Sequence, residues 1–147
     1  MRAGLQRFPI LGATVTDMTM EQALDWIVST MSRADGRTHS VFFVNAHSLN
    51  IASRDAAYRQ ALGSADHVFG DGTGVRWALR WLHGVKLLDN VNGTDLMPRL
   101  LASARPTSRR LYLLGATPSA VARAAEYVER CFRDWTVVGF HHGYLDA

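Results

Sequence analysis

The sequence has few of the features that mark secreted or membrane-spanning proteins. It contains one cysteine, Cys131, so no disulfide can form within the chain, and a reducing cytoplasm is its simplest compartment. The first ten residues hold no apolar stretch long enough for a signal peptide. No run approaches the roughly 20 apolar residues of a membrane-spanning helix. We therefore expect a cytoplasmic protein that contacts a membrane only at its surface.

Lysine is almost absent, because Lys86 is the only lysine among 16 basic residues. With 13 acidic residues the net charge is +3, too small and too dispersed for the basic stripe that nucleic-acid binding requires. We therefore expect no nucleic-acid partner. The arginine bias suits an anionic ligand held by paired hydrogen bonds, although a GC-rich genome would produce the same bias.

Several cofactor and catalytic motifs are also missing. The chain has neither a G-x-x-x-x-G-K-[ST] loop nor a G-x-G-x-x-G fingerprint, which disfavours ATP and NAD. A G-x-S-x-G nucleophile turn is absent as well. The six histidines and Cys131 show no metal-ligand spacing, and no Asp-x-Asp pair is present to hold a cation under a nucleotide diphosphate. We expect neither a metal nor a cofactor.

The pattern that is present is an alternation of strands and helices. At 147 residues, with 48% apolar and 20% charged residues, the chain is predicted to fold as one domain. Short apolar runs at 41–44, 67–69 and 111–114 predict buried strands, and 136–140 is predicted to be the last strand. Helical patterns cover 19–34, 48–62, 75–83, 94–101 and 119–133. This order predicts an α/β fold with a Rossmann-like, mostly parallel sheet flanked by helices.

Candidate functional residues follow the predicted strands, where parallel sheets bind their ligands. That rule places Asn45, the Asp71–Gly72 loop and the Gly115 loop on one edge. Asp71 could accept a proton from a hydroxyl, and the amide of Asn45 could bind a sugar or a base. The alternative is structural, because Asp beside Gly often serves its own turn and Asn often ends a strand.

Further candidates lie at the starts of the predicted helices. Arg76 and Arg80 stand one helical turn apart and could neutralise a diphosphate leaving group, or form a solvated face. Thr94 and Asp95 are predicted to cap their helix, with ligand contact as the second interpretation. Gly115 precedes a helix whose free N–H groups could receive a phosphate.

Five short segments, taken together, carry a family resemblance. They are Val44-Asn45-Ala46-His47, Asp71-Gly72-Thr73-Gly74, Val91-Asn92-Gly93-Thr94-Asp95-Leu96, Leu113-Leu114-Gly115-Ala116 and His142-Gly143-Tyr144. Their order and spacing resemble the WecG/TagA/CpsF family of bacterial glycosyltransferases over nearly the whole chain.

The resemblance implies an inverting, metal-independent transferase of bacterial surface polysaccharide synthesis. Such an enzyme moves a sugar, N-acetylmannosamine in the best-known case, from a UDP donor onto a sugar carried by a polyprenyl diphosphate at the inner face of the cell membrane. By the same resemblance, Asp71 matches the general base and Asn45 matches a position that contacts substrate.

The sequence also departs from the family pattern. Phe43 stands where many relatives carry Thr, and Asn90 stands where an Arg is common. The family continues past His-Gly-Tyr, so we expect residues 1–147 to be a single transferase-like domain without the family's C-terminal portion, with an apolar face open to pairing with another copy. Two alternatives stay open: a catalytically silent nucleotide-sugar-binding or assembly module, and an unrelated Rossmann-like binding domain. The sequence decides neither the donated sugar nor the acceptor.

Overall fold

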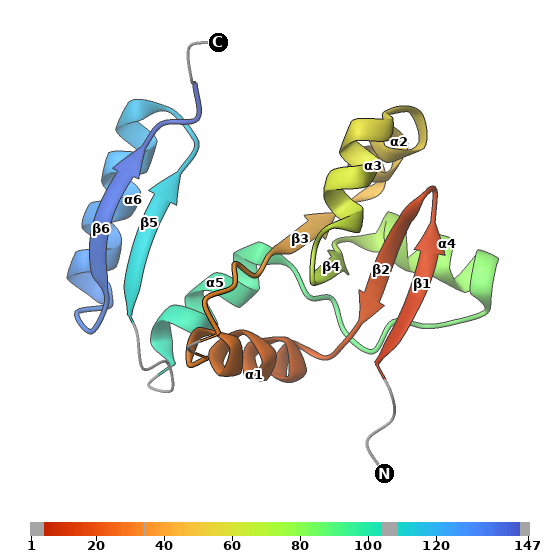
Figure 1. Cartoon of the computed structure of the whole chain (residues 1–147), viewed down its shortest axis with the longest axis horizontal. Helices are drawn as coiled ribbons and strands as arrows, with labels where there is room; N and C mark the ends of the chain where they lie inside the picture. The colour runs from red at the N-terminus through yellow and green to blue at the C-terminus, as the bar shows by residue number, and fades with distance from the viewer. Residues whose placement is uncertain (1–4, 34, 104–108, 145–147) are drawn as a thin grey trace. The chain divides into compact units, whose positions relative to one another are not determined.

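The computed structural model describes residues 5–33, 35–103 and 109–144, in two compact units, 1–99 and 100–147 (Figure 1). The elements are β1 (Gln6–Ile10), β2 (Ala13–Asp17), α1 (Met20–Met31), β3 (Val41–Val44), α2 (Ala46–Arg54), α3 (Ala56–Gly63), β4 (His67–Gly70), α4 (Thr73–His83), α5 (Gly93–Ala102), β5 (Arg110–Leu114), α6 (Pro118–Cys131) and β6 (Thr136–His141). The predicted alternation of strands and helices is confirmed.

The single Rossmann-like sheet is not confirmed. The described strands form three two-stranded sheets, β1–β2, β3–β4 and β5–β6, of which the first is antiparallel and the other two are parallel. Strand pairing joins residues far apart in the chain, so periodicity alone does not fix how many strands share one sheet.

The β1–β2 hairpin is an element that the sequence analysis missed. Leu11 and Gly12 both have positive φ, 48° and 85°, which is the backbone of a two-residue type I′ turn. The register pairs Ile10 with Ala13 across this turn. Gly12 after an apolar run was the available signal.

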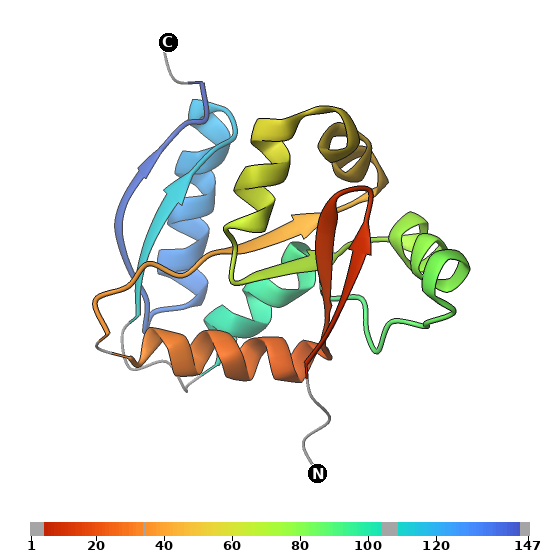
Figure 2. The same cartoon turned by 45° about the vertical axis from the view of Figure 1, so that its right-hand side comes forward.

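The core of the first unit lies around β2, β3 and β4 (Figure 2). β2 lies beside β4, where the ring of His67 is 3.4 Å from the hydroxyl of Thr16. The fully buried side chains of this core include Val15, Val44, Leu49, Val75 and Leu79. α2 and α4, which supply the last three of these residues, follow directly after β3 and β4 and therefore begin at the carboxyl ends of these strands.

Side-chain caps set the helix boundaries of the first unit. The spacing of Thr19 and Gln22 in the sequence predicts a capping box. The structure confirms it, because Thr19 Oγ1 accepts from the Gln22 N–H at 3.2 Å and Gln22 Oε1 accepts from the Thr19 N–H at 2.9 Å. The single helix predicted over 48–62 is wrong. The chain is extended at Asp55, whose carboxylate caps α3 by accepting from the Tyr58 N–H at 3.0 Å.

In the second unit α6 covers one face of the parallel β5–β6 pair. Pro118 lies in the first turn of α6, as its place in the sequence pattern predicts, and Thr117 caps the helix. The strand predicted at 111–114 is confirmed as β5, but the prediction that it is buried is wrong, because Tyr112 and Leu114 are 56% and 64% exposed. Successive side chains of a strand point to opposite faces, and the helix covers only one of them.

Candidate functional site

The structure places Asn45 and Asp71 at one edge of the first unit. β3 and β4 are parallel and in register, with Val44 opposite Gly70, so the next residue of each strand leaves the sheet at the same end. The Asp71 N–H continues this pairing by donating to the Val44 carbonyl at 2.8 Å. The expected meeting of these two side chains thus rests on strand register.

Asn45 is the N-cap of α2. Its Oδ1 accepts from the Ser48 N–H at 3.0 Å and from the Ser48 hydroxyl at 2.9 Å, while Ser48 Oγ accepts from the Asn45 N–H. The structural interpretation of this residue therefore holds for its oxygen. These bonds do not use the amide NH2 group, so the exposed Asn45 can still donate to a ligand.

The carboxylate of Asp71 is placed differently. Asp71 is half-buried, and among the described residues no hydrogen bond or ion pair engages its side chain. An aspartate that served its own turn would accept from the backbone two or three residues on. No such bond is found among the described residues, so the oxygens of this carboxylate are available to a ligand.

Two helices begin beside this carboxylate. Gly72, with φ of 89°, is the N-cap of α4 and provides no side-chain cap. A Cβ placed on Gly74 would lie 3.0 Å from the Cβ of Ala46, so the first turns of α2 and α4 are in contact. Free N–H groups and the positive ends of both helix dipoles therefore gather at this edge, which suits an anionic group.

Asn90 positions the turn that carries Asp71. Its Oδ1 accepts from the Gly72 N–H at 3.1 Å. From the sequence, Asn90 was noted only as a departure from the family pattern. The bond joins residues that are 18 apart in the chain, so no local sequence pattern predicts it. Asn90 is therefore a functional-site residue that the sequence analysis missed in this role.

Two carboxylates fix the loop that carries Asn90. Asp17 accepts from the Leu88 N–H at 2.9 Å, and Asp89 accepts from the N–H groups of Met20 at 3.1 Å and of Asn90 at 2.8 Å. The bonds from Met20 and Asn90 lower the pKa of Asp89, so this carboxylate stays charged at neutral pH. The loop is thereby held to the start of α1.

The start of α5 corrects the prediction for Thr94 and Asp95. The cap is Asn92, which is only 6% exposed and whose Oδ1 accepts from the Asp95 N–H and the Thr94 hydroxyl, both at 2.8 Å. The Asp95 carboxylate accepts in return from Asn92 Nδ2 at 2.8 Å. Thr94 and Asp95 therefore hold the capping residue, and their polar atoms are engaged in doing so. Phe43 packs across the same helix start, with its ring 3.4 Å from where a Cβ of Gly93 would stand.

The remaining predicted residues lie outside this cluster. Arg76 is exposed on the first turns of α4, and its charge helps to lower the pKa of Asp89, after the larger effects of the two backbone bonds and of Arg99. Arg80 is exposed one turn further along. Gly115 belongs to the second unit, where its N–H donates to the His141 carbonyl at 3.0 Å, so the structure does not test whether it joins the site.

A hollow of about 430 Å³ lies along α2, lined by His47, Asn50, Ile51, Arg54 and Asp55. It begins two residues after Asn45 and offers two basic side chains and an amide. In the parts of the chain that the structure describes, no three His, Cys, Asp or Glu residues are grouped so that they could hold a metal ion. The described helices include none with the length and apolar character needed to span a membrane.

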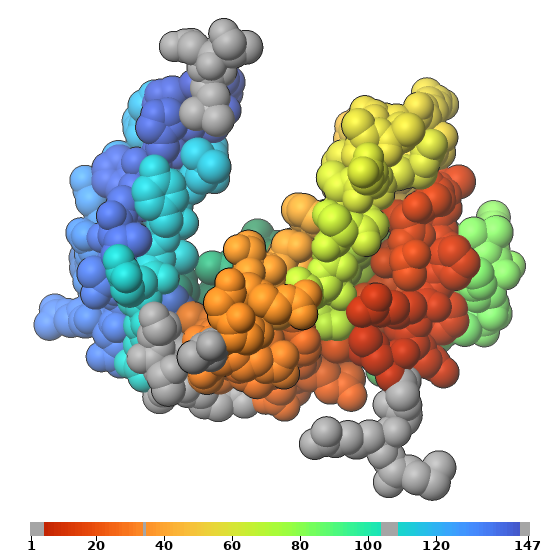
Figure 3. Space-filling model, viewed as in Figure 1, coloured from red at the N-terminus to blue at the C-terminus, as the bar shows by residue number. Residues whose placement is uncertain are grey.

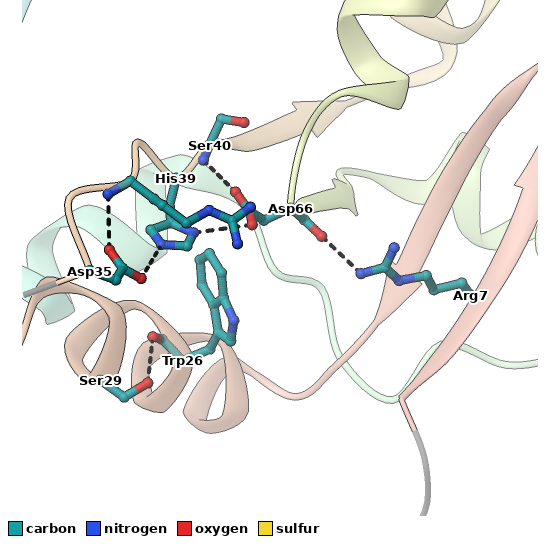
Figure 4. Close-up of polar contacts among 8 residues, drawn as sticks. Arg7, Trp26, Ser29, Asp35, His39, Ser40 and Asp66 are labelled. Carbon is teal, nitrogen blue, oxygen red and sulfur yellow. Dashed lines mark hydrogen bonds and ion pairs between the residues drawn. The ribbon is translucent and has the colours of Figure 1, made fainter. Parts of the chain in front are cut away.

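A second polar cluster lies at the amino ends of β3 and β4, away from the site (Figure 4). Asp66 accepts from the Ser40 N–H at 2.8 Å and pairs with His39 Nδ1 at 3.1 Å, and His39 Nε2 faces Asp35 at 3.3 Å. Arg7 donates to the Asp66 carbonyl at 2.9 Å. These bonds join the loops that precede the two strands, so we assign the cluster to stability.

This cluster predicts how stability depends on pH. Hydrogen bonds to Asp66 and then Asp35 raise the pKa of His39 above 6.5, so its contribution is full below pH 6.5 and is lost as pH rises through the raised value. Burial, followed by the charge of Arg7, lowers the pKa of His67, so its contribution is present above pH 6.5 and is lost as pH falls. The two histidines therefore act in opposite directions.

The two signs can be measured separately by urea unfolding between about pH 5 and pH 9, where the carboxylates stay ionised. The free-energy difference between wild type and His39→Ala should shrink as pH rises. As pH rises, the free energy of unfolding of wild type should increase relative to that of His67→Phe. A His39→Ala difference that does not shrink would contradict the assignment of His39, and a His67→Phe difference that does not grow would contradict that of His67.

The role of Asn90 also has a direct test. Asn90→Ala leaves the Gly72 N–H without its acceptor, which should lower the free energy of unfolding by about 1–3 kcal/mol and speed hydrogen exchange at the Gly72 amide. Asn50→Ala, on the exposed side of α2, is the matched control and should change neither quantity appreciably. Unchanged exchange at Gly72 in Asn90→Ala would show that the bond does not hold the turn.

Comparison with known proteins adds independent information. Residues 8–147 match the model of the glycosyl transferase WecG/TagA/CpsF family. Proteins of Staphylococcus aureus strains NCTC 8325, COL and MRSA252, each named N-acetylglucosaminyldiphosphoundecaprenol N-acetyl-beta-D-mannosaminyltransferase, are 30% identical over 149 residues. The match covers 99% of this chain and 56% of each relative, so the chain spans little more than half the length of these proteins.

Proposed function

The chain belongs to the WecG/TagA/CpsF family of glycosyltransferases, and from this premise we propose that it transfers a sugar from a UDP-sugar to a sugar acceptor linked to polyprenyl diphosphate. The observation that carries the proposal is the Asp71 carboxylate, half-buried and without a partner among the described residues, beside two helix N-termini. A base and an anion-binding edge are the two things that this reaction needs.

The proposed reaction is a single displacement. Asp71 accepts the proton of the acceptor hydroxyl while the hydroxyl oxygen attacks the anomeric carbon of the donor sugar. The bond from that carbon to the diphosphate oxygen breaks, its electron pair leaves with UDP, and the configuration inverts. The free N–H groups of α2 and α4 stabilise the charge that develops on the diphosphate. The Asn45 amide donates to the donor substrate.

The names of the relatives suggest the substrates. Those proteins are named as transferring N-acetylmannosamine to N-acetylglucosaminyl-diphospho-undecaprenol, and we propose a donor of that class or a related hexose for this chain. We propose that the reaction takes place at the cytoplasmic face of the cell membrane, where a UDP-sugar donor and a lipid-linked acceptor can meet. The product would enter the synthesis of a bacterial surface polysaccharide.

A transfer assay tests the proposal. The chain is incubated with a panel of UDP-sugars and a short-chain polyprenyl-diphosphate acceptor carrying N-acetylglucosamine, and the products are identified by mass spectrometry and linkage analysis. Calorimetry with UDP is run in parallel, with uridine as the control that lacks the diphosphate. A new inverted glycosidic bond and a preference for UDP over uridine are expected. Absence of both would overturn the proposal.

A second candidate function is a nucleotide-sugar-binding module without turnover. Such a module would need only the anion-binding edge formed by the first turns of α2 and α4, without proton transfer to Asp71. UDP binding together with no product from any donor would support this module over the transferase. If the chain does not bind UDP, it has the fold of the family but binds another ligand.

A further inference from the structure

α4 exposes an aromatic surface that the candidate site does not use. Trp77 and Trp81 lie one turn apart, 55% and 79% exposed, with their rings edge to face at 5.8 Å and 88°. Leu82 beside them is 63% exposed. The opposite side of the helix buries Val75 and Leu79 in the core, so the fold does not require the two indoles. We call Trp77, Trp81 and Leu82 the indole surface.

The segment that carries the indole surface is basic, and the carboxylate that Arg76 influences, Asp89, already accepts from the N–H groups of Met20 and Asn90. Arg76, Arg80 and Lys86 are exposed on and just after α4, and no acidic residue occurs between Gly72 and Leu88. In Figure 3 α4 (green) lies at the outside of the first unit, beside the β1–β2 hairpin (red). Exposed indoles within a purely basic segment are therefore accessible on this side of the unit.

This chemistry points to an anionic lipid surface as the partner. Indole rings prefer the interface between headgroups and acyl chains, and arginine binds lipid phosphate while its stem remains among apolar groups. A second copy of the same face is a poorer partner, because a two-fold contact through Trp81 would bring the Arg80 side chains of both copies together in a drier environment. The charge of the surface thus selects a partner that is negative.

We propose that α4 docks the protein on anionic membranes through the indole surface, with Arg80 and Lys86 contacting lipid phosphates. Trp81 lies nine residues after Gly72 on one helix, about 14 Å along its axis. Docking through α4 therefore holds the Asp71 edge close to the plane where a lipid-linked acceptor would be presented, and this last step rests on the proposed function. The proposal that the indole surface binds lipid does not depend on the proposed function.

Cosedimentation with vesicles tests the docking surface without any sugar transfer, so its outcome is separate from that of the transfer assay. The chain should bind vesicles of phosphatidylcholine and phosphatidylglycerol in equal parts more tightly than vesicles of phosphatidylcholine alone. Trp77→Ala/Trp81→Ala should weaken binding to the anionic vesicles by about tenfold or more. Raising the salt from about 0.1 M to about 0.5 M should weaken wild-type binding.

The control removes an aromatic ring elsewhere. Tyr127 on α6 is also exposed and packs edge to face on Phe132, so Tyr127→Ala should leave vesicle binding unchanged. Circular dichroism confirms that the double variant is folded. Equal vesicle binding by wild type and the double variant would overturn the proposal. So would a lipid-free dimer, seen by sedimentation velocity, that the double variant no longer forms.

Discussion

Asp71→Asn is expected to lower the rate of sugar transfer by about 10²- to 10⁴-fold, the usual contribution of a general base. The substitution keeps the size and shape of the side chain but replaces the carboxylate by a neutral amide, which cannot accept the proton. Because no described residue bonds to the carboxylate, folding should be unaffected. Initial rates with saturating donor and acceptor give the effect, and calorimetry with UDP should show an affinity close to that of wild type.

Asp134→Asn is the matched control for Asp71→Asn. It makes the same chemical change at an exposed carboxylate of the second unit, which pairs with Arg109. Exposed ion pairs contribute little, so both transfer and stability should stay near wild type. Undiminished transfer by Asp71→Asn would remove Asp71 from the mechanism, and a loss of UDP binding together with folding would make its role structural.

The parts of the fold that sequence predicted are those fixed by local chemistry. Thr19 and Gln22 are three residues apart and form a capping box without help from the rest of the chain. Pro118 likewise lies in the first turn of α6, where the pattern placed it. Each signal works because the interacting atoms belong to one helical turn.

Features that depend on distant partners were not predictable in the same way. The apolar run at 111–114 predicts a strand, yet its burial depends on what covers each face, and α6 covers one. Asp55 lies in a stretch whose composition fits one continuous helix. Its carboxylate instead accepts from the Tyr58 N–H, and this capping bond competes with continuation of the helix, so that 46–63 forms two helices. The hairpin turn places Leu11 at positive φ, a backbone region that leucine rarely adopts.

The candidate site likewise has a part that the sequence predicted and a part that it did not. Asn45 and Asp71 were predictable as neighbours because parallel strands in register end together. The contribution of Asn90 was not, because its bond to Gly72 depends on a loop that Asp17 and Asp89 hold in place. Residues of irregular loops acquire their role from contacts that no sequence period encodes.

Gly70 should be the glycine of this site that least tolerates a side chain. It is the last residue of β4, and a Cβ there would lie 2.6 Å from Val75 Cγ1 and 3.4 Å from Val15 Cγ1. Both valines are fully buried, so neither can move aside without disturbing the core. Gly70→Ala should lower the free energy of unfolding by about 1–3 kcal/mol, measured by urea denaturation.

The same substitution should also weaken UDP binding, because relief of the clash displaces Val75 and with it the first turn of α4 beside Asp71. Gly63→Ala at the end of α3 is the control, since a Cβ there meets no atom within 4 Å, and its effect on stability should stay within about 0.5 kcal/mol. Wild-type stability for Gly70→Ala would show that β4 and α4 are packed less tightly than the structure has them. Lost stability with unchanged UDP affinity would instead show that the nucleotide does not bind at the start of α4.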